Sequence, residues 1–182
     1  MDGNATYRAY SPVTDLDQNV FMTDEPENET EGNGDEGYQT LRGSVTGEDP
    51  EEPIYFAHRA TLRIFGTIPN LDEVSQNLGL APTHVHRRDE LRHTSSRPYR
   101  HDMWIYEPPV KESEPLHAHI DALWVAVRDR KQYLLDLKRT ATVDVFCGYR
   151  SNSDTAGVEV PYQSLQIFQE LQVPFGLSII IT

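Results

Sequence analysis

The sequence predicts an α+β domain in which one β-sheet is packed by helices. In short runs such as ATLRIFGTI, apolar residues alternate with polar ones as in strands, and in the runs between them apolar residues recur every three or four positions. These runs follow one another in the order βαβ, βαβ, βαβ. The last two units spell βαββαβ, so we expect a sheet related to the ferredoxin-like fold.

The first unit starts after Ile54 with a strand in ATLRIFGTI. The helix that follows has Asn70 as its N-cap and Gly79 as its C-cap, because these residue types stabilise those two helix ends. Its apolar face consists of Leu71, Val74 and Leu78. Pro82 prevents the helix from continuing, so THVHRRDEL is expected to be extended.

The second unit contains a strand in HDMWIYEPP, with Met103 and Ile105 on one face and Trp104 and Tyr106 on the other. Residues 116–139 have a helical apolar stripe that is interrupted at RDRK. We therefore expect two short helices or one bent helix there. TVDVFCGYR is a strong strand pattern.

The third unit consists of a short strand at VEV, a helix in PYQSLQIFQELQ and a final strand in PFGLSIIIT. The last run becomes continuously apolar. This pattern is typical of a strand buried on both faces, so we expect it in the middle of the sheet.

Charge divides the chain into two parts. Residues 1–53 contain 14 Asp or Glu and 2 Arg, a net charge of −12, whereas the whole chain carries −13. This first part has too few apolar residues to offset the loss of chain entropy, so it is expected to be a disordered acidic tail. Residues 54–182 are expected to form a single domain.

Composition also indicates the kind of protein. No run approaches the roughly 18 apolar residues of a membrane span, and the polar, acidic start does not match a secretory signal. The single cysteine, Cys147, is consistent with a reducing compartment, and we expect a cytoplasmic protein. Nucleic acid is not expected as a partner, because the acidic tail would repel phosphates.

Several of these segments together resemble a known family. ATLRIFGT, LDEVSQNLGLAPT running into HRRDE, the Trp-containing HDMWIYEP, VDVFCGY and VEVPYQSLQIFQELQVPFGLSI are similar to a bacterial family described as a domain of unknown function, family 4279. The resemblance covers about residues 60–182. It implies a cytoplasmic bacterial protein encoded near toxin or defence genes, and it transfers no catalytic residues.

The segment around His84 holds the densest polar chemistry of the chain. On a strand, His84 and His86 project to the same face, but no third metal ligand at a known spacing accompanies them, so no metal or other cofactor is assigned. The segment also contains several arginines, whose guanidinium groups suit carboxylates and phosphates, so an anion site is one hypothesis for it. Alternatively, these arginines pair with the acids of the protein itself.

Trp104 and Tyr106 could add an aromatic binding surface if they face away from the helices, with Arg63 and Asp144 beside them. The alternative is that the helices cover them. The candidate binding residues are therefore His84, His86, Arg87, Arg88, Arg100, Trp104 and Tyr106.

Other reactive residue types have simpler interpretations. His117 and His119 point to different faces of a helix, so they are interpreted as polar residues of a helix start. Cys147 is interpreted as a small buried core residue and not as a nucleophile. No catalytic motif is present, so no catalytic residue is assigned and an enzyme is the less favoured class.

The leading functional hypothesis is a non-catalytic protein-interaction domain, an immunity-like or inhibitor protein whose acidic tail would attract a basic partner. The alternative is a small-ligand or anion-binding site, with or without catalysis, built on His84–Arg88. A third hypothesis is a structural subunit in which LSIII pairs across the edge of an oligomer.

Overall fold

The computed structural model describes residues 53–91, 97–153 and 157–182. The predicted acidic tail therefore lies outside the described residues, except for Pro53. No helix in the described ranges has the length and apolar character needed to cross a membrane.

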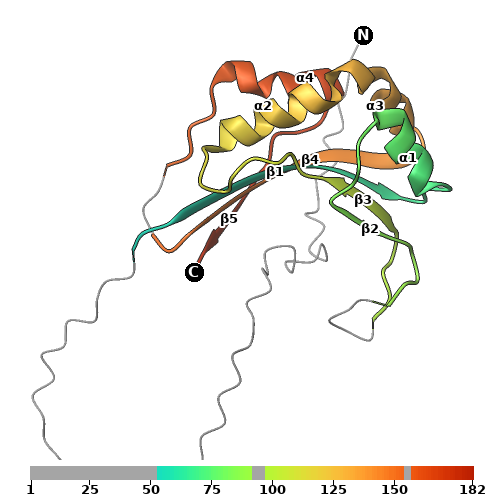
Figure 1. The fold of residues 1–182 in the computed structure, drawn as a ribbon, viewed down its shortest axis with the longest axis horizontal. Coiled ribbons are helices and arrows are strands. Elements are labelled where there is room, and N and C mark those ends of the chain that lie inside the picture. The colour runs from blue at the N-terminus through green and yellow to red at the C-terminus, as the bar shows by residue number, and fades with distance from the viewer. Residues whose placement is uncertain (1–52, 92–96, 154–156) are drawn as a thin grey trace, which may run out of the picture. The chain divides into compact units, whose positions relative to one another are not determined.

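The described residues form one five-stranded sheet, which confirms the α+β class. The strands lie in the order β2-β3-β1-β4-β5, and all neighbours are antiparallel except β4 and β5, which are parallel. Figure 1 shows the sheet as a curved layer. The strands are β1 (Phe56–Gly66), β2 (His84–His86), β3 (Asp102–Tyr106), β4 (Ala141–Ser151) and β5 (Leu177–Ile181).

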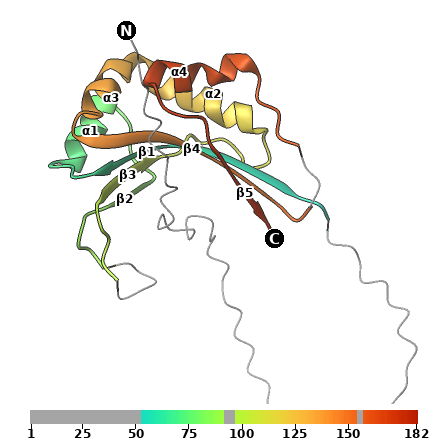
Figure 2. The same cartoon turned by 180° about the vertical axis from the view of Figure 1, so that it is seen from behind.

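The helices lie on one face of this sheet, and no described helix covers the other face (Figures 1 and 2). The interruption at RDRK forms a 3-10 turn, Arg128–Arg130, that separates two helices, so the two-helix form of the prediction is confirmed. The α-helices are α1 (Leu71–Leu78), α2 (Leu116–Val127), α3 (Lys131–Leu137) and α4 (Gln166–Leu171), and a second 3-10 turn, Tyr162–Leu165, precedes α4.

Helix α1 has the predicted ends. The side chain of Asn70 accepts hydrogen bonds from the N–H groups of Asp72 and Glu73, and Gly79 adopts the left-handed conformation, with φ of 68°, that glycine accommodates without strain. The predicted apolar face is buried against the sheet, and it consists of Leu71, Val74 and Leu78.

The long central strands β1 and β4 provide the floor of the core. Their antiparallel register places Ile64 opposite Val143 and Ala60 opposite Cys147 on the helix-covered face. Facing residues on the helices complete the core, and Ile120, Leu123, Leu134, Ile167 and Leu171 are all fully buried.

Of the two alternatives for Trp104 and Tyr106, the structure supports the one in which the helices cover them. The register of β1 with β3 pairs Ile64 with Trp104, so Trp104 shares the helix-covered face with Ile64. Trp104 is 0% exposed, and its indole Nε1 donates a 2.9 Å hydrogen bond to Ser75 Oγ on α1. Tyr106 lies partly buried against the same core.

Two predictions for the third unit are wrong. Val158–Val160 does not form a strand, because β1 and β5 already occupy both edges of β4 and Pro161 has no N–H to donate. The last run forms β5, which lies at the edge of the sheet and not in its middle. A continuous apolar run cannot distinguish these two positions, because side-chain pattern does not report how many neighbours a strand has.

Removing the Ser75 hydroxyl should destabilise the fold, because the buried Trp104 indole N–H would lose its acceptor. We expect Ser75→Ala to lower the free energy of unfolding by about 1–3 kcal/mol in urea denaturation. The exposed Ser178→Ala on β5 is the matched control, with an expected change within about 0.5 kcal/mol. Equal effects of the two substitutions would contradict this role of Ser75.

Candidate functional site

The two histidines of the predicted site lie on β2, at the edge of the sheet opposite to β5. Their side chains project to the same face, as expected, and the register places them beside Ile105 and Met103 on the face that the helices leave uncovered. His84 Nε2 and His86 Nδ1 are 3.0 Å apart and share one hydrogen bond. The His86 ring also stacks on Tyr99, with ring centroids 3.5 Å apart.

The nearby arginines bind groups of the protein itself. The guanidinium of Arg87 donates a 2.9 Å hydrogen bond to the carbonyl oxygen of Ile68, and Arg88 Nε lies 3.5 Å from the Asp89 carboxylate in an exposed pair. Arg100 is exposed. The structure therefore favours the second interpretation for Arg88, which pairs with an acid of the protein itself.

Asp102 connects the segments that follow β1 and β2. Its carboxylate accepts hydrogen bonds from the backbone N–H groups of Ile68 and Arg88, at 2.8 and 3.0 Å. Burial raises the pKa of Asp102, but these hydrogen bonds and the positive charges of Arg87 and Arg88 outweigh burial, so the net pKa is lowered. The carboxylate acts as a structural acceptor between the end of β1 and the end of β2.

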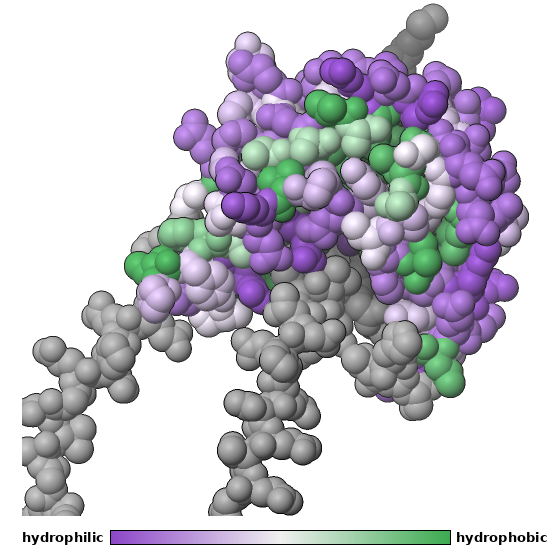
Figure 3. All heavy atoms as spheres, viewed as in Figure 1, coloured by the Kyte–Doolittle hydropathy of each residue, from purple (hydrophilic) through white to green (hydrophobic). Residues whose placement is uncertain are grey.

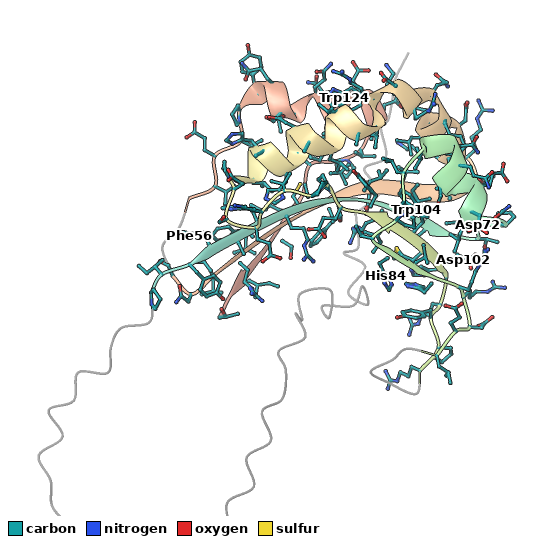
Figure 4. The ribbon with its side chains drawn as sticks, in the orientation of Figure 1. Phe56, Asp72, His84, Asp102, Trp104 and Trp124 are labelled. Carbon is teal, nitrogen blue, oxygen red and sulfur yellow. The ribbon has the colours of Figure 1, made fainter. Side chains whose placement is uncertain are left out.

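The predicted site residues do not converge on one pocket. His84 and His86 lie on the uncovered face of the sheet, whereas Trp104 lies on the helix-covered face (Figure 4). Arg63 and Asp144, which were expected beside Trp104, instead pair on the uncovered face. Their two hydrogen bonds measure 2.8 and 2.6 Å, and the Arg63 guanidinium lies 4.7 Å from the centre of the Phe146 ring.

Within the described ranges, no three His, Cys, Asp or Glu side chains lie close enough together to hold a metal ion. His93, a third histidine of this segment, lies outside the described residues.

A larger cleft lies at the other end of the sheet, on the helix-covered face, and it was not predicted. It has a volume of about 730 Å³ and is formed by the start of β1, the end of β4, the start of α2 and the segment before α4. Figure 1 shows the start of β1 extending past the helices at this end. The lining residues are Phe56, His58, Ser113, Pro115, Leu116, His117, Tyr149, Gly157, Val158, Glu159 and Pro161.

Polar aromatic side chains gather in and beside this cleft. His58 and Tyr149 are register neighbours on β1 and β4, and their ring centroids are 5.3 Å apart. Tyr149 Oη is buried and has no hydrogen-bond partner among the described residues. Behind them, His119 on α2 is 0% exposed, and its ring has only the backbone groups of Lys111 and Glu114 as hydrogen-bond partners among the described residues. A buried polar group without a partner is rare in folded proteins, so the Tyr149 hydroxyl makes this end of the sheet a candidate binding site.

Burial lowers the pKa of both His58 and His119, because the imidazolium form loses its hydration. Backbone groups of Glu112 and Glu114 partly oppose this change at His58, and those of Glu114 and Lys111 partly oppose it at His119. The mutual repulsion of the two rings adds to the lowering at His119. Both histidines are therefore expected to be neutral at pH 7.

Sequence reasoning missed this cleft because its walls come from segments far apart in the chain. Local spacing classified His117 and His119 as helix-start polar residues, and His119 is in fact buried. Nothing in the sequence indicates that His58 and Tyr149 face each other, because their pairing depends on the register of β1 with β4. A histidine on an otherwise apolar helix face was the one available signal.

The buried histidine should make stability depend on pH. Because the folded-state pKa of His119 lies below its unfolded value of about 6.5, the unfolded chain binds more protons in acid, and stability is lost as the pH falls below that value. We expect His119→Leu to be nearly neutral or stabilising at pH 7.5, and to reduce the loss of unfolding free energy between pH 7.5 and 5.5. The contribution of one proton is at most about 1.4 kcal/mol per pH unit. Equal losses of unfolding free energy in the variant and in the unaltered chain, measured by urea denaturation, would contradict this role of His119.

Cys147 has the environment predicted for a core residue. It is fully buried on β4, and burial raises the pKa of its thiol to about 12. We expect no reaction with a disulfide reagent at pH 8 while the protein is folded, and complete reaction in 8 M urea, as measured by absorbance. Rapid labelling of the folded protein would show instead that the core opens readily at β4.

Comparison with known proteins gives one match. A family model described as "Domain of unknown function (DUF4279)" matches residues 56–182, which is nearly the whole of the described part of the chain. No curated protein and no solved structure matches.

Proposed function

The chain belongs to the DUF4279 family, and we propose that this member is a non-catalytic interaction domain that binds an extended segment of a partner protein along β5. The family description states no activity, so the proposal depends on the geometry of the chain itself. The observation that carries it is the position of β5 as an apolar edge strand.

Strand β5 has the properties of an open pairing edge. It bonds to β4 on one side, and no strand in the described ranges pairs with its other side. Along that side, backbone N–H and C=O groups can pair with a further strand. Ile179 and Ile181 are 59% and 50% exposed, although burying such side chains is favourable.

Edge strands are normally protected by charged residues, proline or shortness. The sequence of β5, LSIII, contains no charged residue and no proline. By contrast, the opposite edge strand β2 has three residues, and two of them are histidines. The two edge strands therefore differ in their protection against strand addition, and β5 is the strand suited to pairing with a further strand.

The surroundings of β5 indicate the chemistry of the partner segment. Figure 3 shows hydrophobic residues gathered at the end of the molecule where Phe56 is labelled in Figure 4. Phe56 is 45% exposed and lies in the same cross-strand row as Ile181, through Ser151. A partner strand with apolar residues at alternate positions would cover Ile179 and Ile181 on the helix-covered face of the sheet.

An immunity-like or inhibitor role in a bacterial cytoplasm is the specific form of this function that we favour. An inhibitor needs a surface that holds its target without chemistry, and strand addition supplies affinity through backbone hydrogen bonds. The net charge of −13 would accelerate association with a basic target.

The second candidate is a small-ligand or anion site on His84–Arg88. A cleft of about 360 Å³ between β2 and α1 is lined by His86 and Arg87, among others, which favours this candidate. However, the Arg87 guanidinium already binds the Ile68 carbonyl, and Glu90 lines the same cleft. A bound anion would have to compete with both, so this candidate is the weaker one.

Charge on β5 should abolish partner binding. We expect the double variant Ile179→Lys, Ile181→Lys to lose at least tenfold in affinity for a partner isolated with the full-length chain from its host, as measured by calorimetry. Both side chains are exposed, so the fold should persist. The partner should also slow amide hydrogen exchange of Leu177–Ile181.

Leu91→Lys is the matched control, because Leu91 is 70% exposed and lies outside the sheet strands. It should bind the partner like the unaltered chain. If the β5 variant binds the partner equally well, strand addition is wrong. If the unaltered chain sediments as a dimer and the β5 variant as a monomer, a second copy of the chain is the occupant of this edge.

A further inference from the structure

The start of α2 at the large cleft has the features of a binding site for a negatively charged group. The N-cap is Pro115, which has no side-chain hydrogen bond to offer, and the first turn contains no acidic residue. The backbone N–H groups of Leu116 and His117 therefore have no hydrogen-bond partner among the described residues. Such groups and the helix dipole together favour an anion.

A second, independent observation lies on the opposite wall of the cleft. Tyr149 lines the cleft and is 2% exposed, and its hydroxyl group has no hydrogen-bond partner in the described part of the chain. His58, next to Tyr149, also lines the cleft. Leaving a buried hydroxyl unpaired is unfavourable, so a ligand that accepts its hydrogen bond recovers that loss.

Apolar side chains also line the cleft. Phe56, Leu116, Val158 and Pro161 line the cleft together with the polar groups, and the volume of about 730 Å³ suits a small organic molecule. The site therefore combines donors for an anionic head with a surface for an apolar body.

We propose that this cleft binds a carboxylate joined to an apolar or aromatic group. The carboxylate accepts hydrogen bonds from the N–H groups of Leu116 and His117 and from Tyr149, and the apolar group packs on Phe56 and Val158. The proposal does not rest on strand addition at β5, because Ile179 and Ile181 do not line the cleft, although Phe56 borders both surfaces.

The charges around the cleft favour a single negative charge over a phosphate dianion. Glu159 lies on the rim and is exposed, and Glu112 and Glu114 lie near the buried histidines. Among the described residues no Lys or Arg lines the cleft, and burial lowers the pKa of both His58 and His119. Without a lysine or arginine and with these acids nearby, the site favours a carboxylate over a group with a second negative charge.

The test is a titration of the full 182-residue chain with phenylacetate at pH 7.5, with phenylacetamide as the neutral control of the same shape. NMR shifts of the His58 and His117 rings report binding. We expect phenylacetate to bind at least tenfold more tightly than phenylacetamide. Equal binding of the two, or no shift with 20 mM phenylacetate (roughly the weak limit for so small a ligand), would overturn the proposal.

Tyr149→Phe removes one donor without changing the volume of the cleft. We expect it to weaken phenylacetate binding about tenfold, since hydrogen bonds to charged groups are strong, and to leave the unfolding transition unchanged or raised, because the hydroxyl has no partner in the free protein. Tyr55→Phe is the matched control, since that hydroxyl binds Thr182 and not the cleft. Unchanged phenylacetate affinity in Tyr149→Phe would overturn the proposal.

A second variant does not alter the core. Ser113 is exposed and lines the cleft near the start of α2, so Ser113→Glu would place a carboxylate at the same helix end. We expect it to weaken phenylacetate binding at least tenfold, and full affinity would contradict the assignment. An apolar peptide ending in a free carboxylate, compared with its C-terminal amide, identifies the source of the group. Tighter binding of the peptide acid than of phenylacetate indicates a protein C-terminus, and weaker binding indicates a small metabolite.

Discussion

The antiparallel pairing of β1 with β4 is the constraint on which the rest of the structure depends. Eleven residues of each strand are in register, from Phe56 opposite Ser151 to Gly66 opposite Ala141. This register decides which side chains share a face, and a shift by one residue would move every one of them to the other side. The core, the Arg63–Asp144 pair and the contact between His58 and Tyr149 are all consequences of this one alignment.

Features with a local physical cause could be predicted from the sequence. The ends of α1 follow from Asn70 and Gly79, and the division of residues 116–139 into two helices follows from the interruption of the apolar stripe. The faces of β3 were also separated correctly. Alternation shows that Met103 and Trp104 point in opposite directions, but it does not show which face the helices cover, and this depends on the neighbours of β3.

The candidate sites follow the same division. The histidines of β2 stand two residues apart, so their common face was predictable, whereas the burial of Trp104 against α1 was not. The large cleft needs the start of β1, the end of β4 and the start of α2 to meet, and these are separated by tens of residues. Reading one segment at a time cannot find such a site, because its polar groups become neighbours only after the strands have paired.

The Arg63–Asp144 pair has a consequence for how the sheet is assembled. Apolar side chains specify the alignment of β1 and β4 on the helix-covered face, but the uncovered face has a weaker apolar pattern. There, a guanidinium and a carboxylate meet through two hydrogen bonds at one cross-strand position. Any misaligned pairing would separate these partly buried charges. The ion pair therefore destabilises wrong alignments of β1 and β4 more than it stabilises the right one.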